Sequence, residues 1–131
     1  MFNWGKKEPN KNVNALAIDI HSHLLPGLDD GVQTYEESED IILHFQKLGY
    51  RKLITSPHVM SDTYRNSSER ILARLAKLQT YLKNQQVEVE IQAAAEYYLD
   101  EQVFKMVEEN QRMLTFGKNY LLFETNFLNE P

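Results

Sequence analysis

The sequence predicts an α/β domain in which parallel strands alternate with helices. The chain has 131 residues, which is enough for one domain with its own core and too few for two. Four apolar runs are separated by stretches with helix-start signals, in the order β-α-β-α-β-α-β. Potential metal ligands follow these runs, namely His21 and His23, His58, Glu96, and Glu124. Because α/β barrels carry their chemistry at the carboxyl ends of parallel strands, we expect these side chains to gather at one edge.

The amino-acid composition excludes several classes of function and site. The chain has 14 basic and 19 acidic residues, a formal charge of −5, and no basic stripe, so we expect no nucleic-acid partner. It has no cysteine, which excludes disulfides, thiolate metal sites and a cysteine nucleophile. No apolar run approaches the ~20 residues of a membrane span. We therefore expect a cytoplasmic protein without a membrane span.

The first strand is predicted at residues 15–20, after a polar, flexible leader at residues 1–14, so that the domain covers residues 15–131. This strand runs into His21 and His23. Residues i and i+2 of an extended strand point the same way, so both imidazoles can face one divalent cation. A His-x-His pair alone is a weak signal, and the ligands at the other strand ends give it weight.

The first helix is predicted to begin after Thr34, because Thr34 and Glu37 form a capping box. Gly49 is expected as the residue that ends this helix. The expected apolar face consists of Ile41, Phe45 and Leu48.

The second strand is predicted at residues 52–55 and is stopped by Pro57. A polar loop at residues 59–67 follows and carries Arg65. Ser67 or Ser68 is then expected to cap the second helix. The apolar stripe of this helix is the clearest in the sequence and comprises Ile71, Leu75, Leu78 and Leu82.

The third strand is predicted to start near Val87 and to run to Glu96. Asp100 is expected to cap a shorter helix that carries Val103, Phe104 and Val107. After a turn at residues 117–119, the apolar run at residues 120–123 predicts a fourth strand buried on both faces. Four parallel strands cannot close a barrel that normally takes about 250 residues, so the sequence predicts a small open sheet or the front part of a longer protein.

Five motifs carry a resemblance to a known family: Asp-Ile-His-Ser-His, Asp-Asp-Gly, Thr-Ser-Pro-His-Val-Met, Ala-Ala-Glu-Tyr-Tyr and Leu-Leu-Phe-Glu. In this order and spacing the chain resembles the polymerase-and-histidinol-phosphatase (PHP) superfamily. Within it, the chain is similar to the metal-dependent bacterial tyrosine phosphatases encoded with capsule and exopolysaccharide genes. The resemblance runs from about residue 18 to residue 131. It implies the N-terminal portion of a TIM-like PHP barrel, which this chain leaves incomplete.

The resemblance also implies a set of site residues. His21, His23 and Glu96 would hold one metal and form the catalytic centre, Glu96 and Glu124 a second metal, and Asp30 and His58 a third. The family uses Mn²⁺ or a similar ion, which suits imidazole mixed with carboxylate. It completes each metal with a later histidine and an Asp-x-His pair, yet no histidine follows His58 here.

Three further residues receive weaker predictions. Arg65 could help to hold phosphate, although an exposed loop arginine is an equally good interpretation. Asp19 and Asp29 are expected to support the ligands rather than to bind metal directly.

The implied reaction is attack of a metal-activated hydroxide on phosphorus, without a cysteine nucleophile. The expected partner is a tyrosine-phosphorylated protein such as a bacterial tyrosine kinase, in the regulation of capsule or exopolysaccharide synthesis. The alternatives are a histidinol-phosphate type of PHP phosphoesterase, a truncated domain that only binds, and an amidohydrolase. For the 131-residue chain itself we expect little activity and self-association through the open sheet edge.

Overall fold

The computed structural model describes residues 17–125. The predicted leader and the first two residues of the predicted first strand lie outside these described residues.

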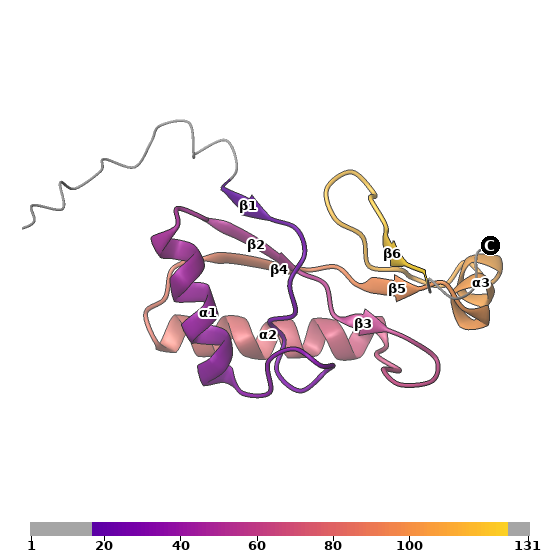
Figure 1. Cartoon of the computed structure of the whole chain (residues 1–131), viewed down its shortest axis with the longest axis horizontal. Coiled ribbons are helices and arrows are strands. Elements are labelled where there is room, and N and C mark those ends of the chain that lie inside the picture. The colour runs from indigo at the N-terminus through magenta and orange to yellow at the C-terminus, as the bar shows by residue number, and fades with distance from the viewer. Residues whose placement is uncertain (1–16, 126–131) are drawn as a thin grey trace, which may run out of the picture.

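The described chain alternates strands with helices, as the sequence predicts (Figure 1). Its elements are β1 (Ile18–Asp19), α1 (Tyr35–Lys47), β2 (Lys52–Thr55), β3 (His58–Val59), α2 (Ser68–Asn84), β4 (Glu90–Ala93), β5 (Glu96–Tyr98), α3 (Glu101–Glu108) and β6 (Leu122–Glu124). Every pairing between these strands is parallel. The predicted α/β class with a parallel sheet is therefore confirmed.

The strands form two three-stranded sheets, β1-β2-β4 and β3-β5-β6. The predicted second strand is confirmed, because β2 ends at Thr55 before Pro57, and the chain resumes pairing after Pro57 in a separate strand, β3, which was not predicted. The third strand likewise continues past Ala94 and Ala95 into β5. Hydrogen bonds bridge the interruptions, from Ala94 N–H to the carbonyl oxygen of Thr55 and from Glu96 N–H to that of Pro57, both 2.9 Å. The same two chain segments thus pass from the first sheet into the second.

Helix α1 begins as expected, since the Thr34 hydroxyl accepts a hydrogen bond from Glu37 N–H at 3.1 Å. The Glu37 carboxylate accepts from Gln33 N–H rather than from Thr34 N–H. Gly49 follows the helix with a φ of 95°, a conformation that glycine adopts without strain.

The predicted apolar face of α1 was wrong for two of its three residues, whereas Phe45 packs against the core as expected. Ile41 and Leu48 are 40% and 66% exposed, whereas Ile42 is fully buried. The helix is turned so that Ser38 and Ile42 face the core, and the Ser38 hydroxyl donates to the carbonyl oxygen of Leu24 at 2.8 Å. This contact with the preceding loop fixes which side of the helix is buried.

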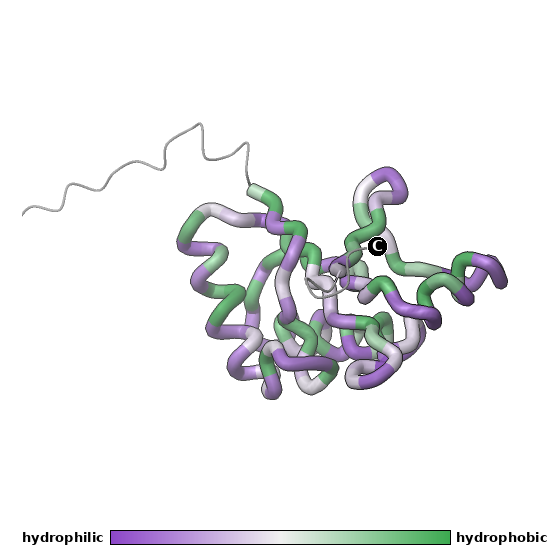
Figure 2. The backbone as a smooth tube through the Cα atoms, turned by 45° about the vertical axis from the view of Figure 1, so that its right-hand side comes forward, coloured by the Kyte–Doolittle hydropathy of each residue, from purple (hydrophilic) through white to green (hydrophobic). Residues whose placement is uncertain are grey.

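Helix α2 agrees with its prediction. The Ser67 hydroxyl caps it by accepting from Arg70 N–H, and the four residues of the predicted stripe are buried. They join one core with Leu53 of β2 and Ile91 of β4. In Figure 1, α1 and α2 lie on the same side of these strands, and Figure 2 shows hydrophobic stretches along the central strands.

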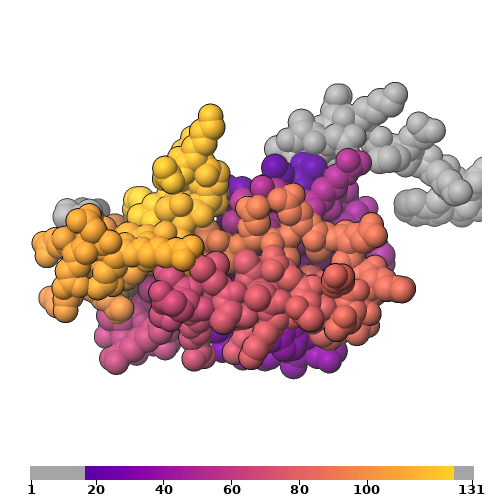
Figure 3. All heavy atoms as spheres, turned by 180° about the vertical axis from the view of Figure 1, so that it is seen from behind, coloured from indigo at the N-terminus to yellow at the C-terminus, as the bar shows by residue number. Residues whose placement is uncertain are grey.

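The last predicted strand differs from its expectation. β6 covers Leu122–Glu124, and Tyr120 and Phe123 are 63% and 55% exposed rather than buried on both faces. β6 pairs only with β5 among residues 17–125, and none of its residues joins the hydrophobic core. Figure 3 shows the hairpin loop that leads into β6 projecting from the rest of the molecule. The short helix α3 begins at Asp100 as predicted, but only Val103 of its three expected apolar residues is buried.

Within the described range, no helix combines the length and the apolar character needed to cross a bilayer.

Candidate metal centre

Three groups of histidine and acidic side chains lie beyond the carboxyl ends of the sheet β1-β2-β4, where the second sheet, β3-β5-β6, begins. In each group the potential ligand atoms are all within 4.8 Å of one another. The groups are His21, His23 and Glu96; His58, Glu96 and Glu124; and His23, Asp29, Asp30 and His58. The structure thus brings together all six residues that the sequence predicts as metal ligands. Their role as ligands stays a prediction.

The parallel register explains how residues so distant in sequence meet. His58 of β3 pairs with Glu96 of β5, so the two side chains stand next to each other on neighbouring strands. Glu124 of β6 pairs with Tyr98 of β5, two residues beyond Glu96. Residues i and i+2 share a face of a strand, so Glu124 joins the same side.

The two histidines after β1 are each held through Nδ1. The Nδ1 of His21 lies 2.7 Å from the Ser56 hydroxyl, and the Nδ1 of His23 lies 2.7 Å from Asp29 Oδ2. Their Nε2 atoms lie 3.8 Å and 3.3 Å from Oε2 of Glu96. A histidine that donates from Nδ1 to a carboxylate keeps the lone pair on Nε2, which is the arrangement of a metal-binding imidazole.

Asp29 is buried and holds the ring of His23, which agrees with its predicted supporting role. Its carboxylate accepts hydrogen bonds from the His23 ring and from the backbone N–H groups of Gly31 and His58. Although burial alone would raise it, the pKa of Asp29 is lowered by these bonds. The hydrogen bond from His23 to Asp29 in turn raises the pKa of His23, against the opposing effect of burial. The other predicted supporting carboxylate, Asp19, lies in β1, and burial raises its pKa.

Glu96 occupies the centre of the cluster and is 8% exposed. Its Oε2 lies 3.3 Å from both His23 Nε2 and His58 Nδ1, yet neither Oε2 nor His58 Nδ1 has a hydrogen-bond partner among the described residues. A buried carboxylate oxygen without a donor is costly, and a cation among these atoms removes the cost. Imidazole nitrogens mixed with carboxylate oxygens suit a divalent transition-metal ion. The residues therefore fit the metal that the sequence implies.

His58 connects two of the groups. Its Nε2 lies 3.3 Å from Asp30 Oδ1, and its Nδ1 lies 3.2 Å from Glu124 Oε1. The Asp30 side chain is 66% exposed, so this group opens to solvent.

Residue 31, in the turn before α1, must be glycine because there is no space for a side chain. A Cβ at Gly31 would stand 2.4 Å from both the Cβ and the carbonyl oxygen of His23. The turn can therefore press against the backbone of a candidate ligand only because residue 31 has no side chain.

The contacts of Arg65 do not support its predicted phosphate-binding role. Its Nε donates to the carbonyl oxygen of Ser61 at 2.6 Å. Arg65 lines a cavity of about 380 Å³ together with residues of α2 and α3, and none of the six candidate ligands lines this cavity.

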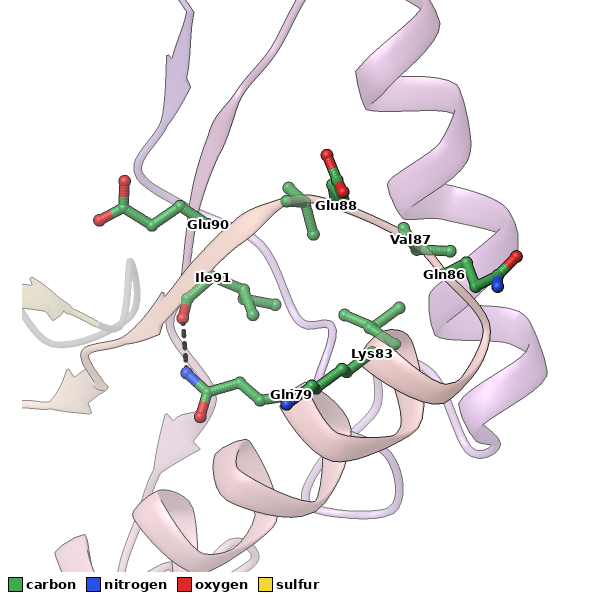
Figure 4. Close-up of a pocket in the computed structure, with 9 residues that line it drawn as sticks. Gln79, Lys83, Gln86, Val87, Glu88, Glu90 and Ile91 are labelled. Carbon is green, nitrogen blue, oxygen red and sulfur yellow. Dashed lines mark hydrogen bonds between the residues drawn. The ribbon is translucent and has the colours of Figure 1, made fainter.

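A larger cavity of about 600 Å³ lies at the opposite end of the sheet, between the last turns of α2 and the chain that enters β4 (Figure 4). Gln79 closes one side of it by donating from its side-chain amide to the carbonyl oxygen of Ile91 at 3.0 Å. None of the site histidines lines it. The metal cluster is therefore separate from this cavity.

Comparison with known proteins identifies the family. The model of the family described as "Capsular polysaccharide synthesis, CpsB/CapC" matches residues 17–130. The chain belongs to the CpsB/CapC family. It is 25% identical over 114 residues to the tyrosine-protein phosphatase YwqE of Bacillus subtilis (strain 168), covering 87% of this chain and 45% of YwqE. It is 24% identical over 107 residues to the tyrosine-protein phosphatase CpsB of Streptococcus pneumoniae, covering 82% of this chain and 44% of CpsB.

A solved structure agrees with this assignment. It comes from work on YwqE and CpsB, described as unique metal-dependent tyrosine phosphatases, and matches with a TM-score of 0.74 at 25% identity. The match covers 84% of this chain and 44% of the solved one. The chain thus spans less than half the length of these CpsB/CapC relatives.

Sequence reasoning missed three residues that support the centre of this CpsB/CapC chain. Ser56 contacts His21, Tyr64 stacks on His58, and the Asn66 amide donates to the carbonyl oxygen of His58 at 2.9 Å. Ser56 reaches His21 only through the parallel pairing of two strands. The one available signal for Tyr64 and Asn66 was their closeness in sequence to His58.

Proposed function

We propose that this chain carries most of the metal ligands of a metal-dependent protein-tyrosine phosphatase, as the N-terminal portion of a TIM-like PHP barrel. The observation that carries the proposal is the central carboxylate. Glu96 Oε2 is buried, has no donor in the described chain, and lies within 3.8 Å of nitrogens from three histidines. Membership of the CpsB/CapC family supports the same reaction.

The three groups of side chains support the proposed division of ligands. His21, His23 and Glu96 would hold one ion and Glu96 with Glu124 a second, each set lying within one observed group. Asp30 and His58 would hold a third, and they too share a group. We propose Mn²⁺ or a similar divalent ion.

The residues of the chain would perform distinct tasks. Ions bound here would supply positive charge to phosphate oxygens and a water of lowered pKa. Asp29 and Ser56 hold the rings of His23 and His21 at Nδ1, which directs their Nε2 atoms toward Glu96. These 131 residues contain no cysteine, so the chain itself offers no cysteine nucleophile.

The proposed substrate is a tyrosine-phosphorylated protein, with a bacterial tyrosine kinase as the partner. The setting would be the cytoplasm of a bacterium that regulates capsule or exopolysaccharide synthesis. The relatives named as tyrosine-protein phosphatases, and the family description, support this choice over a histidinol-phosphate type of phosphoesterase.

Activity assays on the complete product of the gene test the proposal. We expect hydrolysis of phosphotyrosine peptide to require Mn²⁺, to be lost with a chelator, and to exceed hydrolysis of histidinol phosphate. His21→Ala and Glu96→Gln should each lower kcat/KM by about three orders of magnitude or more, because the attacking water is activated at this cluster.

His44→Ala is the matched control. This histidine is exposed on α1, and its Nδ1 contacts only the carbonyl oxygen of Asp40 in its own helix. It should leave kcat/KM unchanged. Turnover that survives exhaustive chelation, or a Glu96→Gln variant with normal activity, would refute the proposed mechanism.

The 131-residue chain by itself is expected to bind metal weakly and to turn over little substrate. The observation in favour is that no histidine follows His58, so an ion at each group has few protein ligands. Calorimetric titration with Mn²⁺, beside a phosphatase assay of the same sample, tests this expectation. Full metal-dependent turnover by the chain alone would contradict it.

A further inference from the structure

The three histidines of the cluster are not held in the same way. Both His21 and His23 have an Nδ1 hydrogen-bond partner at 2.7 Å. The Nδ1 of His58 is buried and has no such partner among residues 17–125. No hydrogen bond from Nδ1 therefore fixes the ring plane of His58.

The ring plane matters more for His58 than for the other two. Its Nδ1 faces Glu96 and Glu124 at 3.3 and 3.2 Å, and its Nε2 faces Asp30 at 3.3 Å. A quarter-turn about the Cβ–Cγ bond would carry both ring nitrogens away from these carboxylates. This terminal torsion has broad, roughly two-fold energy wells, so the surroundings must select the orientation.

Aromatic packing is the restraint that the structure provides. The ring of Tyr64 is stacked on the His58 ring, with centroids 5.7 Å apart and planes 17° apart. The His23 ring lies at 4.5 Å with planes 30° apart. Near-parallel rings on an imidazole resist rotation out of the shared plane, because rotation loses the stacking contact.

The loop that carries Tyr64 is anchored at several points. Met60 N–H donates to the carbonyl oxygen of Tyr64 at 2.8 Å, and Ser61 N–H donates to Asp100 Oδ2 at 3.0 Å. Asn66, 6% exposed, donates from its side-chain amide to the carbonyl oxygens of His58 and Leu28. The phenol ring is thus supported by a loop that is tied to the backbone of His58 itself.

We propose that Tyr64 is a positioning residue that fixes the ring plane of His58, in place of the Nδ1 hydrogen bond that the other two histidines have. The inference rests on the proposed metal site. The part that matters is the aromatic face of Tyr64, which stacks on His58, whereas its hydroxyl makes no hydrogen bond to the described residues. Removing the face should let the His58 ring turn and should weaken any ion that uses its nitrogens.

Two substitutions separate the face from the hydroxyl. Tyr64→Phe keeps the ring, and Tyr64→Leu removes it while leaving an apolar side chain. Tyr120→Leu is the control, since this tyrosine is 63% exposed on the hairpin before β6. Circular dichroism establishes that each variant is folded.

The first measurement needs no metal. In the metal-free 131-residue chain, nuclear Overhauser contacts of the two carbon-bound protons of the His58 ring report its orientation. We expect one ring plane in the wild type, in Tyr64→Phe and in Tyr120→Leu, and exchange with other ring planes in Tyr64→Leu. A single unchanged orientation in Tyr64→Leu would overturn the proposal.

The second measurement is calorimetric titration with Mn²⁺ alone. Loss of a residue that orients a ligand typically weakens metal binding by about 10- to 100-fold, and we expect this range for Tyr64→Leu. Tyr64→Phe and Tyr120→Leu should stay within about twofold of the wild type. Equal losses in Tyr64→Phe and Tyr64→Leu would overturn the role of the aromatic face. If the wild-type chain binds no Mn²⁺, the proposed metal site fails, and the ring orientation alone decides the role of Tyr64.

Discussion

The sheet β1-β2-β4 and the strand β6 both carry large apolar side chains, but Leu53 and Ile91 in the sheet are buried, whereas Phe123 in β6 is exposed. Leu53 and Ile91 are 0% and 3% exposed, because helix α2 packs against their sheet. Phe123 of β6 is 55% exposed and does not join this core, although β4, which carries Ile91, is an edge strand as well. Apolar composition therefore indicates what a strand can bury, whereas its neighbours decide what it does bury.

This difference runs through the candidate site. Glu96 belongs to β5, which has a strand on each side, whereas His58 and Glu124 belong to β3 and β6, the two edge strands of that sheet. The side chain of Glu124 is 35% exposed, against 15% for His58 and 10% for Glu96, so Glu124 has the least support of the three.

The largest effect on stability should distinguish the two regions directly. Leu78 is fully buried in α2, so Leu78→Ala should lower the free energy of unfolding by about 2–5 kcal/mol. Phe123→Ala should lower it by less than about 1 kcal/mol, because the side chain is mostly exposed already. Urea unfolding of dilute 131-residue chain, followed by circular dichroism, measures both. Equal losses of unfolding free energy in the two variants would show that Phe123 is packed in solution and would contradict the difference between the two regions.

A smaller effect concerns self-association through the β6 edge. No strand of residues 17–125 pairs with the outer edge of β6, and this edge and its exposed apolar side chains favour pairing with a second copy, which a charge on the edge strand opposes. Phe123→Lys should raise the dissociation constant of the dimer about tenfold or more, a change of about 1.4 kcal/mol. Phe104→Lys, on the exposed side of α3, is the matched control and should change it little. Sedimentation equilibrium measures both constants, and a wild-type chain that stays monomeric at all concentrations would contradict the expectation.

The smallest expected effect is the pH-dependent contribution to stability of Asp100, which caps the N-terminus of α3. Although burial would raise it, the pKa of Asp100 is lowered by hydrogen bonds from the backbone N–H groups of Ser61 and Val103. A carboxyl whose pKa is lower in the folded state stabilises the fold above its unfolded pKa of about 3.9, and this stabilisation is lost as the pH falls through the folded value.

Asp100→Asn keeps a capping side chain but does not titrate. We expect the difference in unfolding free energy between wild type and variant to shrink by less than about 1 kcal/mol from pH 6 to pH 3, because the group is mostly solvated. Urea unfolding at several pH values measures this difference. A difference that grows toward low pH would have the wrong sign.

The sequence predicted the features that depend on local pattern. The caps at Thr34, Ser67 and Asp100 and the stripe of α2 are confirmed, because each is decided within a few residues. The gathering of ligands at strand ends also followed, since parallel strands align their carboxyl ends.

The features that the sequence could not predict depend on contacts between distant segments. Ile41 and Ile42 satisfy a helical apolar pattern equally well, and the bond from Ser38 to the Leu24 carbonyl oxygen settles which one is buried. Continuation of the chain into β3 after Pro57 depends on pairing with β5. A closed barrel and the identity of the metal stay predictions.

Gly31 has a consequence for how this family tolerates mutation. It has no side chain to offer to the cluster, yet a methyl group there would overlap the backbone of His23. In a library that samples every position, variants at residue 31 should therefore disappear together with those at the candidate ligands. Selection on function alone would then place an inert residue among the most restricted positions, and only the three-dimensional contact would explain its presence there.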